Sequence, residues 1–176
     1  MKWTIPAFKH AVWQDFAIDI LSDLILETDK VYQLVGANGA GKSSFIKKIL
    51  IPAIQSNPDN QYILYIEQQI QSQFDAVKSY AALQKPSARL KTFGEMIEFQ
   101  IKQLSKSIAV APRPCMIILD ECNLRSEIIS KLARFKIKEY CLVVVSHQEI
   151  ENDMRAELWQ IRFDVIDINN TRVALQ

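Results

Sequence analysis

One stretch of nine residues carries the clearest chemistry in the sequence. It matches the pattern G-x-x-x-x-G-K-[ST], with both glycines, the lysine and the serine at their required positions. A loop of this pattern holds a chain of phosphate groups, whose negative charges need hydrogen-bond donors that are fixed before the ligand arrives. The nine residues are Gly36, Ala37, Asn38, Gly39, Ala40, Gly41, Lys42, Ser43 and Ser44.

The residue types in this loop have separate tasks. The glycines let the backbone approach the phosphates and adopt positive φ angles, so that backbone N–H groups can point at the ligand. Lys42 is expected to reach the β- and γ-phosphates as a point charge, and the Ser43 hydroxyl to be a ligand of Mg²⁺. A glycine-rich turn ahead of a helix is the alternative, but such a turn needs neither the lysine nor the serine.

The loop requires a strand before it and a helix after it. Residues 30–35 form a short apolar run that predicts a buried strand, and residues 45–50 predict a helix. The positive end of that helix would add to the attraction for phosphate. We expect the helix to end near Leu50, because Pro52 follows within two residues.

A pair of carboxylates follows another apolar run. Residues 115–119 are apolar throughout, which is typical of a parallel strand buried on both faces, and Asp120 and Glu121 come directly after them. An Asp-Glu pair after a strand is common by itself. Downstream of a phosphate-binding loop, the pair predicts that Asp120 holds a metal ion through water and that Glu121 polarises the attacking water.

Two more polar residues end predicted strands. Gln68 follows residues 62–66 and is a candidate contact for Mg²⁺ or for the attacking water, although Gln69 fits almost as well and both fit a surface position. His147 follows residues 141–145, where its imidazole would face the γ-phosphate. A histidine after a strand is also an ordinary loop residue.

Strands and helices alternate along the chain. This order predicts an α/β fold, a P-loop NTPase domain whose mostly parallel central sheet has helices on both faces and a ligand crevice at the carboxyl ends of its strands. We expect residues 1–176 to form a single domain that begins with an antiparallel β flap of two or three strands. Helices are predicted at about residues 74–84, 94–108 and 128–135, and a C-terminal hairpin at 159–168 and 171–175.

The composition is that of an ordinary soluble globular protein, with 49% hydrophobic and 23% charged residues. The net charge of +1 does not indicate a broad basic surface, so nucleic acid is not an expected partner. Three cysteines without paired spacing and two histidines argue against a zinc site. No apolar run is long enough to span a membrane and the first residues lack the apolar core of a signal peptide, so we expect a cytoplasmic location.

In the order and direction of these motifs, the chain resembles the ATP-binding cassette (ABC) ATPases. The resemblance implies an enzyme that binds and hydrolyses ATP with Mg²⁺ as cofactor. The motifs that carry it are the loop of residues 36–44, Tyr65-Ile66-Glu67-Gln68 at the Q-loop position, Ile117-Ile118-Leu119-Asp120-Glu121 at the Walker B position and Val145-Ser146-His147 at the switch-histidine position.

The resemblance also implies roles for single residues. Lys42, Glu121 and His147 would act in catalysis. The metal ligands would be Ser43, Gln68 and Asp120. In the family an aromatic residue upstream of the loop stacks on adenine, and Trp13 lies at a suitable distance with Phe16 second, although both also fit a core position.

Three features of the motifs depart from the family pattern. In the window of the family signature, Leu-Ser-Gly-Gly-Gln, the chain has residues 90–95, where Thr92 keeps a hydroxyl but Phe93 replaces a glycine. In the family this motif caps the ATP bound by the opposite subunit, so a bulky residue there speaks against fast, symmetric hydrolysis. After the Walker B glutamate, Cys122 replaces the usual proline. The D-loop aspartate has no clear match, although Glu127 lies near its place.

The arm that the family inserts between the Q-loop and the signature is also short. Thr92 follows Gln68 by 24 residues, and the whole arm, about 69–113, has room only for short helices. A long coiled coil, as in the DNA-associated heads of SMC type, does not fit this length. In a transporter subunit of the family the arm is a larger helical subdomain, so an arm of this length would be a reduced form of it.

We therefore expect a small ABC-type ATPase that works as a homo- or heterodimer, as the nucleotide-binding subunit of a membrane transporter, held at the inner face of the membrane by a permease subunit. A second interpretation is a nucleotide-dependent interaction or regulatory subunit with slow or no hydrolysis, which Phe93 and the short arm favour. An SMC-type head is a third. A small-molecule kinase is a fourth, and it leaves Gln68 and His147 unexplained.

Overall fold

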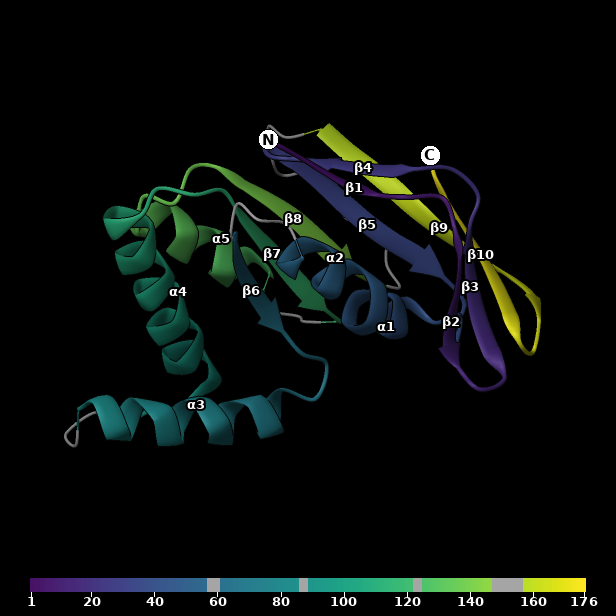
Figure 1. Cartoon of the computed structure of the whole chain (residues 1–176). Coiled ribbons are helices and arrows are strands. Elements are labelled where there is room, and N and C mark those ends of the chain that lie inside the picture. Colours follow the sequence, from purple (N-terminus) through teal and green to yellow (C-terminus); the bar gives the residue numbers. More distant parts are fainter. Residues whose placement is uncertain (57–60, 86–88, 122–124, 147–156) are drawn as a thin grey trace.

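A computed structural model describes residues 1–56, 61–85, 89–121, 125–146 and 157–176, and shows two β-sheets with helices packed around the larger one (Figure 1). The larger sheet has the strand order β2-β3-β10-β9-β5-β8-β7-β6, and the smaller pairs β1 with β4. The strands are β1 (Lys2–Ile5), β2 (Lys9–Trp13), β3 (Phe16–Ile20), β4 (Leu24–Glu27), β5 (Lys30–Gly36), β6 (Tyr62–Ile66), β7 (Cys115–Asp120), β8 (Tyr140–Val145), β9 (Glu157–Asp167) and β10 (Asn170–Leu175).

The strands β6, β7, β8, β5 and β9 are parallel neighbours and form the centre of the larger sheet. Their arrowheads point toward the same edge in Figure 1. Gly36, Ile66, Asp120 and Val145 are the last residues of β5, β6, β7 and β8, so the polar residues that follow these strands start from one edge. The predicted fold class, a mostly parallel P-loop NTPase sheet with helices on both faces, is confirmed.

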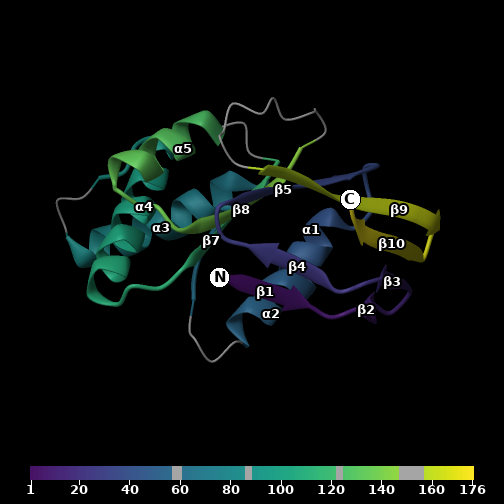
Figure 2. The same ribbon diagram turned by 90° about the horizontal axis from the view of Figure 1, so that it is seen from above.

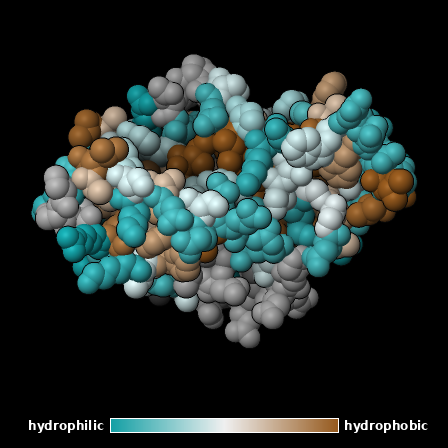
Figure 3. All heavy atoms as spheres, turned by 90° about the horizontal axis from the view of Figure 1, so that it is seen from below, coloured by the Kyte–Doolittle hydropathy of each residue, from teal (hydrophilic) through white to brown (hydrophobic). Residues whose placement is uncertain are grey.

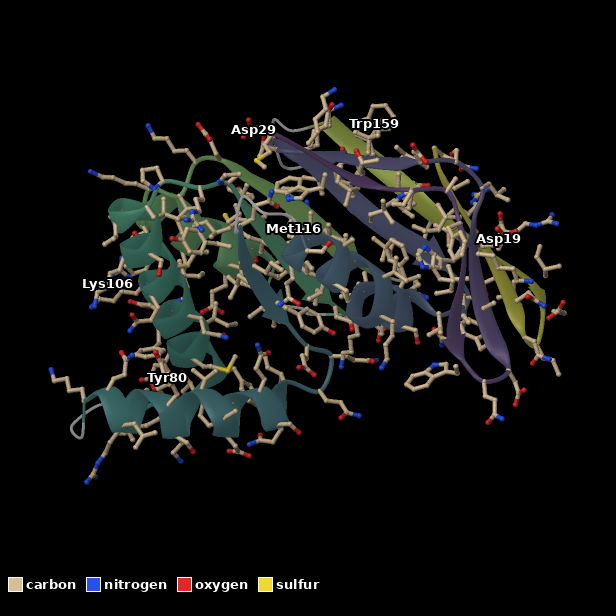
Figure 4. The ribbon with its side chains drawn as sticks, in the orientation of Figure 1. Asp19, Asp29, Tyr80, Lys106, Met116 and Trp159 are labelled. Atoms are coloured by element: carbon tan, nitrogen blue, oxygen red, sulfur yellow. The ribbon has the colours of Figure 1, made fainter. Side chains whose placement is uncertain are left out.

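The alternation of side chains along β7 explains why both faces of the sheet are covered. Met116 and Ile118 belong to one buried core together with the helices that follow the phosphate-binding loop, and Figure 4 labels Met116 close to these helices. Ile117 and Leu119 belong to a second buried core with helices α4 (Phe93–Val110) and α5 (Arg125–Arg134). A strand buried on both faces must be apolar at every position, as residues 115–119 are.

The N-terminal strands are divided between the two sheets. The predicted flap of two or three strands is instead four strands, in which β1 and β4 pair antiparallel and the β2–β3 hairpin joins the larger sheet by a parallel pairing of β3 with β10. Trp3 and Leu26 from the small sheet share a core with Phe45 and Ile46. Viewed from above, β1 and β4 lie across the helices α1 and α2 (Figure 2).

The helix after the loop runs past the predicted end at Leu50. It consists of α1 (Lys42–Phe45), a π-helical stretch η1 (Ile46–Leu50) and α2 (Ile51–Gln55). Pro52 is at the start of α2 and does not end the helix. The wider π turn ahead of it relieves the clash between a proline ring and the preceding turn, which explains why the prediction was wrong.

The arm has two helices, α3 (Ile70–Gln84) and α4 (Phe93–Val110), and α5 (Arg125–Arg134) packs beside α4. α3 projects across the lower end of α4 (Figure 1). Phe74 of α3 and Phe93 of α4 stack edge to face, with ring centroids 5.3 Å apart. Among the described residues, no helix is long and apolar enough to cross a membrane.

Candidate functional site

The loop from β5 to α1 has the backbone geometry that its glycines predict. Gly36 has φ 154° and Gly41 has φ 88°, in the region that L side chains rarely adopt. Both glycines also pack too tightly for a side chain, because a Cβ atom at Gly36 would lie 2.7 Å from the carbonyl oxygen of Phe163, and one at Gly41 would lie 2.8 Å from the ring of Phe16. The loop is therefore held against β3 and β9 in one shape.

Lys42 extends back over this loop. Its Nζ donates hydrogen bonds to the carbonyl oxygens of Gly36 at 2.8 Å and Ala37 at 2.9 Å, and the residue is 5% exposed. Burial lowers the pKa of the Lys42 ammonium, and the negative charges of Glu121 and Asp120 oppose that shift. The cation thus sits beside the loop amides, with carbonyl partners that an incoming phosphate oxygen can replace.

Asp120 is fixed by two hydroxyl groups. Ser43 Oγ donates to its Oδ1 at 3.0 Å, and Tyr65 Oη donates to its Oδ2 at 2.9 Å. The residue is 1% exposed; burial raises the pKa of its carboxyl group, and the two hydrogen bonds lower it. The loop serine and the Walker B carboxylate, 77 positions apart, are therefore in direct contact.

Glu121 lies at the end of β7 in an unusual backbone conformation, with φ 53°. Its backbone N–H donates to the carbonyl oxygen of Val145 at 3.2 Å, and its carboxylate accepts a hydrogen bond from the side-chain amide of Gln68. A non-glycine residue held in this region costs free energy, and such residues cluster at functional sites. Gln69, the alternative to Gln68, is the N-cap of α3; both residues are exposed, but only Gln68 lines the polar cavity beside the loop.

Of these residues, Lys42, Ser43, Gln68 and Glu121 line one polar cavity of about 490 Å³, and Asp120 is hydrogen-bonded to Ser43. The cavity volume falls within the usual range for small-molecule sites. The cavity has oxygen atoms of a hydroxyl, a carboxylate and an amide beside it. These are the kinds of ligand that Mg²⁺ prefers, so the residues present fit this ion. The cavity is lined by Asn38, Gly39, Ala40, Gly41, Lys42, Ser43, Ser44, Gln68 and Glu121.

Two residues near the loop belong to the predicted adenine contact. Trp13, on β2, is 58% exposed, and the Nζ of Lys48 lies 4.9 Å from its ring centroid. Phe16 instead packs its ring against Gly41, beneath the loop. Trp13 thus has an accessible ring, whereas Phe16 supports the loop. His147 and Cys122 lie outside the described residues, although β8 ends at Val145 directly beside Asp120.

Two carboxylates of the chain itself lie at the start of α4, where the family signature is expected. Thr92 Oγ1 accepts from the N–H of Glu95 at 3.2 Å, and Glu95 Oε2 accepts from the N–H of Thr92 at 3.2 Å and from that of Lys91, in a capping box. Glu127 lies so close that a Cβ atom at Gly94 would be 2.8 Å from its carboxylate. Two negative charges therefore occupy the positive end of this helix.

Sequence reasoning missed two residues that support the site. Tyr65 contacts Asp120, and its only signal was a hydroxyl within an apolar strand three residues before Gln68. Gln73 of α3 accepts from the N–H of Glu67 at 3.0 Å and donates to the carbonyl oxygen of Tyr65 at 2.6 Å. Tyr65 lies in the stretch at the Q-loop position but had no role assigned to it, and Gln73 belongs to no motif.

A second hollow lies between the edge strand β6 and the arm. Figure 3 shows apolar side chains gathered in a recess of this face, and the cavity there measures about 490 Å³. Figure 4 shows Tyr80 on the side of α3 that faces α4. The lining residues come from β6, α3 and α4: Tyr62, Ile63, Leu64, Ala76, Val77, Tyr80, Phe99, Gln100, Gln103, Leu104 and Ser107.

No protein-family model matches the chain, and no curated protein is similar to its sequence at a significant level. Solved structures do resemble its fold. The ATP-binding subunit of an ABC transporter aligns over 100% of this chain and 90% of its own, with 13% identity and a TM-score of 0.57. An ATP-binding cassette of an ABC transporter in its ADP conformation aligns over 99% and 91%, with 13% identity and a TM-score of 0.53.

A third structure, a model of ribosome-bound archaeal Pelota and ABCE1, aligns over 99% of this chain with 16% identity and a TM-score of 0.55. The present chain spans only 34% of that protein's chain. At these identities the likeness concerns the fold alone. The chain thus has the fold of ABC-type ATP-binding domains, and its phosphate-binding loop and strand-end carboxylates occupy one edge of that fold.

Proposed function

We propose that residues 1–176 act as one ABC-type ATPase domain that binds and hydrolyses Mg·ATP. The observation that carries the proposal is that Lys42, Ser43 and the Gln68–Glu121 pair line one cavity, with Asp120 hydrogen-bonded to Ser43. Phosphate groups would lie against the loop amides and Lys42. Ser43, Gln68 and Asp120 would hold Mg²⁺, which supplies charge neutralisation for the phosphates when it is bound.

Within this site, Glu121 would orient and polarise a water molecule, and Gln68 would hold the glutamate carboxylate in place. His147, which follows β8, would sense the γ-phosphate. Trp13 would stack on the adenine through the ring face that Lys48 does not cover. These roles follow the positions at which the sequence resembles the ABC ATPases.

The biological setting is the second part of the proposal. The chain would work as a dimer in the cytoplasm and would drive a membrane permease as its nucleotide-binding subunit. The fold likeness to transporter ATP-binding subunits supports this setting. The apolar hollow between β6 and the arm also supports it, because exposed apolar recesses of this kind often receive partner proteins.

A specific observation favours a second candidate function. Glu95 and Glu127 lie at the start of α4, so this helix repels an anion where the family signature would bind the γ-phosphate of an opposite subunit. In this candidate the chain binds ATP, hydrolyses it slowly or not at all, and uses its nucleotide state to recruit a partner. The arm does not support the SMC-type role, because its helices α3 and α4 are too short for a long coiled coil.

Phosphate release by the purified protein with Mg·ATP, measured over a range of protein concentrations, separates the two candidates. Turnover that rises more than linearly with protein concentration supports a hydrolysing dimer. Tight ATP binding without phosphate release supports the regulatory subunit. Absence of both binding and turnover in folded protein contradicts both.

A further inference from the structure

One residue to which the sequence motifs assign no role contacts the candidate metal site directly. Tyr65 Oη donates to Asp120 Oδ2 at 2.9 Å, while Ser43 Oγ donates to the other carboxylate oxygen at 3.0 Å. Because Asp120 is 1% exposed, water cannot easily replace either donor. Each oxygen of the carboxylate therefore has one hydroxyl partner, and the pair fixes the rotation of the carboxylate about its last bond.

The pairing of β6 with β7 explains how Tyr65 reaches Asp120. In the parallel register Tyr65 lies opposite Ile118, two residues before Asp120 and on the same face of the sheet. The ring of Tyr65 packs on the core beneath the loop helix. A tyrosine here bridges the remaining distance along the strand, and a shorter hydroxyl residue such as serine would not reach.

Further contacts hold Tyr65 in this position. The side-chain amide of Gln73 donates to the Tyr65 carbonyl oxygen at 2.6 Å, and the Nζ of Lys47 lies 5.7 Å from the ring centroid. Lys47 also forms an ion pair with Glu67 at 3.1 Å. The Tyr65 hydroxyl is therefore directed at Asp120 by strand β6, by Gln73 of the arm and by Lys47 of the helix after the phosphate-binding loop.

We propose that Tyr65 is a positioning residue for the magnesium ion. Its hydroxyl binds one oxygen of Asp120 and keeps the other oxygen beside Ser43. The two candidate metal ligands, Ser43 and Asp120, are therefore in position before the ion binds. The inference rests on the proposed binding of Mg·ATP. A partner of this kind, one step removed from the ion, typically changes metal affinity by about 10- to 100-fold when it is removed.

The test compares Tyr65→Phe with Tyr62→Phe. Both substitutions remove one hydroxyl from β6 and keep the ring, but Tyr62 Oη donates to the carbonyl oxygens of Ser107 and Ala111 in the arm, away from the site. ATP binding is measured by calorimetry at increasing Mg²⁺ and again in EDTA, together with the melting temperature of each variant.

We expect Tyr65→Phe to need about tenfold more Mg²⁺ for the same gain in ATP affinity, and to bind ATP in EDTA as the wild type does. Tyr62→Phe should match the wild type in both conditions, whatever its melting temperature. A wild-type Mg²⁺ dependence in Tyr65→Phe, or an equal loss of affinity with and without Mg²⁺, would overturn the role of Tyr65 alone. A wild-type protein that binds no Mg·ATP would overturn this inference and the proposed function together.

Discussion

The side-chain amide of Gln68 donates a hydrogen bond to the carboxylate of Glu121, joining two residues that lie 53 positions apart in the chain. The contact links the carboxyl ends of β6 and β7 directly beside the phosphate-binding loop. Gln73 ties the residues just before Gln68 to α3. A movement of the arm would therefore change the position of Gln68 relative to Glu121.

Replacement of Glu121 by glutamine should separate binding from hydrolysis. The amide keeps an oxygen that accepts from Gln68 but cannot polarise water as a carboxylate does, so we expect phosphate release to fall at least about 100-fold while ATP affinity stays within about twofold. The variant should also accumulate as an ATP-bound dimer, which size-exclusion chromatography measures. Glu139→Gln, at an exposed position, is the matched control. Undiminished turnover in Glu121→Gln would exclude the glutamate from the reaction.

Two glycines of the loop should differ in their tolerance of alanine. At Gly39 a Cβ atom meets nothing within 4 Å, so only the positive φ of 77° opposes it, at a cost of about 1 kcal/mol of unfolding free energy. At Gly36 the Cβ atom also overlaps the backbone of Phe163, and we expect Gly36→Ala to cost about 3 kcal/mol. Chemical denaturation of the two variants checks the order, and equal losses would mean that the loop does not pack as described.

Trp13 should contribute to the binding of ATP but not of phosphate alone. Removing an aromatic ring that stacks on a base costs roughly 1–3 kcal/mol, so Trp13→Ala should lower ATP affinity by about tenfold or more. Affinity for tripolyphosphate, which has no base, should not change. Titration of both ligands in calorimetry provides the comparison. If ATP affinity is the same in Trp13→Ala, the adenine does not stack on this residue.

The ion pairs between α4 and α5 predict a pH dependence of stability. A hydrogen bond from Lys131 holds the pKa of Glu98 below its usual value of 4.5, with a further contribution from the charge of Arg134. Because the folded-state pKa is depressed, this stabilisation is complete above pH 4.5 and is lost as the pH falls through the folded-state value.

The Glu98 side chain is 36% exposed, so screening by solvent limits the effect. We expect Glu98→Gln to lower the free energy of unfolding by about 0.5 kcal/mol at pH 7 and by less at about pH 3, where the carboxylate of the wild type begins to be protonated. Urea denaturation at the two pH values measures the difference. A loss that is equal at both pH values would show that the carboxylate charge does not stabilise the contact.

Much of the fold could be predicted because its signals are local. Residues 115–119 are apolar at every position, since β7 is covered by cores on both faces, and this pattern identified a buried parallel strand. The loop was predicted because its glycines are required by backbone geometry at Gly36 and Gly41. The carboxylates followed because the ends of parallel strands meet at one edge.

The features that could not be predicted depend on contacts between distant segments. The helix continues past Pro52 through a π-helical stretch, which a proline rule does not anticipate. The N-terminal strands divide between two sheets because the β2–β3 hairpin pairs with β10, at the other end of the chain. Tyr65 gained its place beside Asp120 from the register of β6 on β7, which the sequence of either strand alone does not define.

The most direct test of the account is the affinity of the protein for Mg·ATP before and after Lys42→Ala. Lys42 supplies the only loop cation among the described residues lining the cavity, so its removal should weaken binding by about 100-fold or more. Lys106→Ala is the control, because Lys106 points away from the body of the molecule on α4 (Figure 4). Micromolar or tighter binding by the wild type and by Lys106→Ala, with loss in Lys42→Ala, is the predicted result. Equal binding by all three proteins, or none by the folded wild type, would contradict the account.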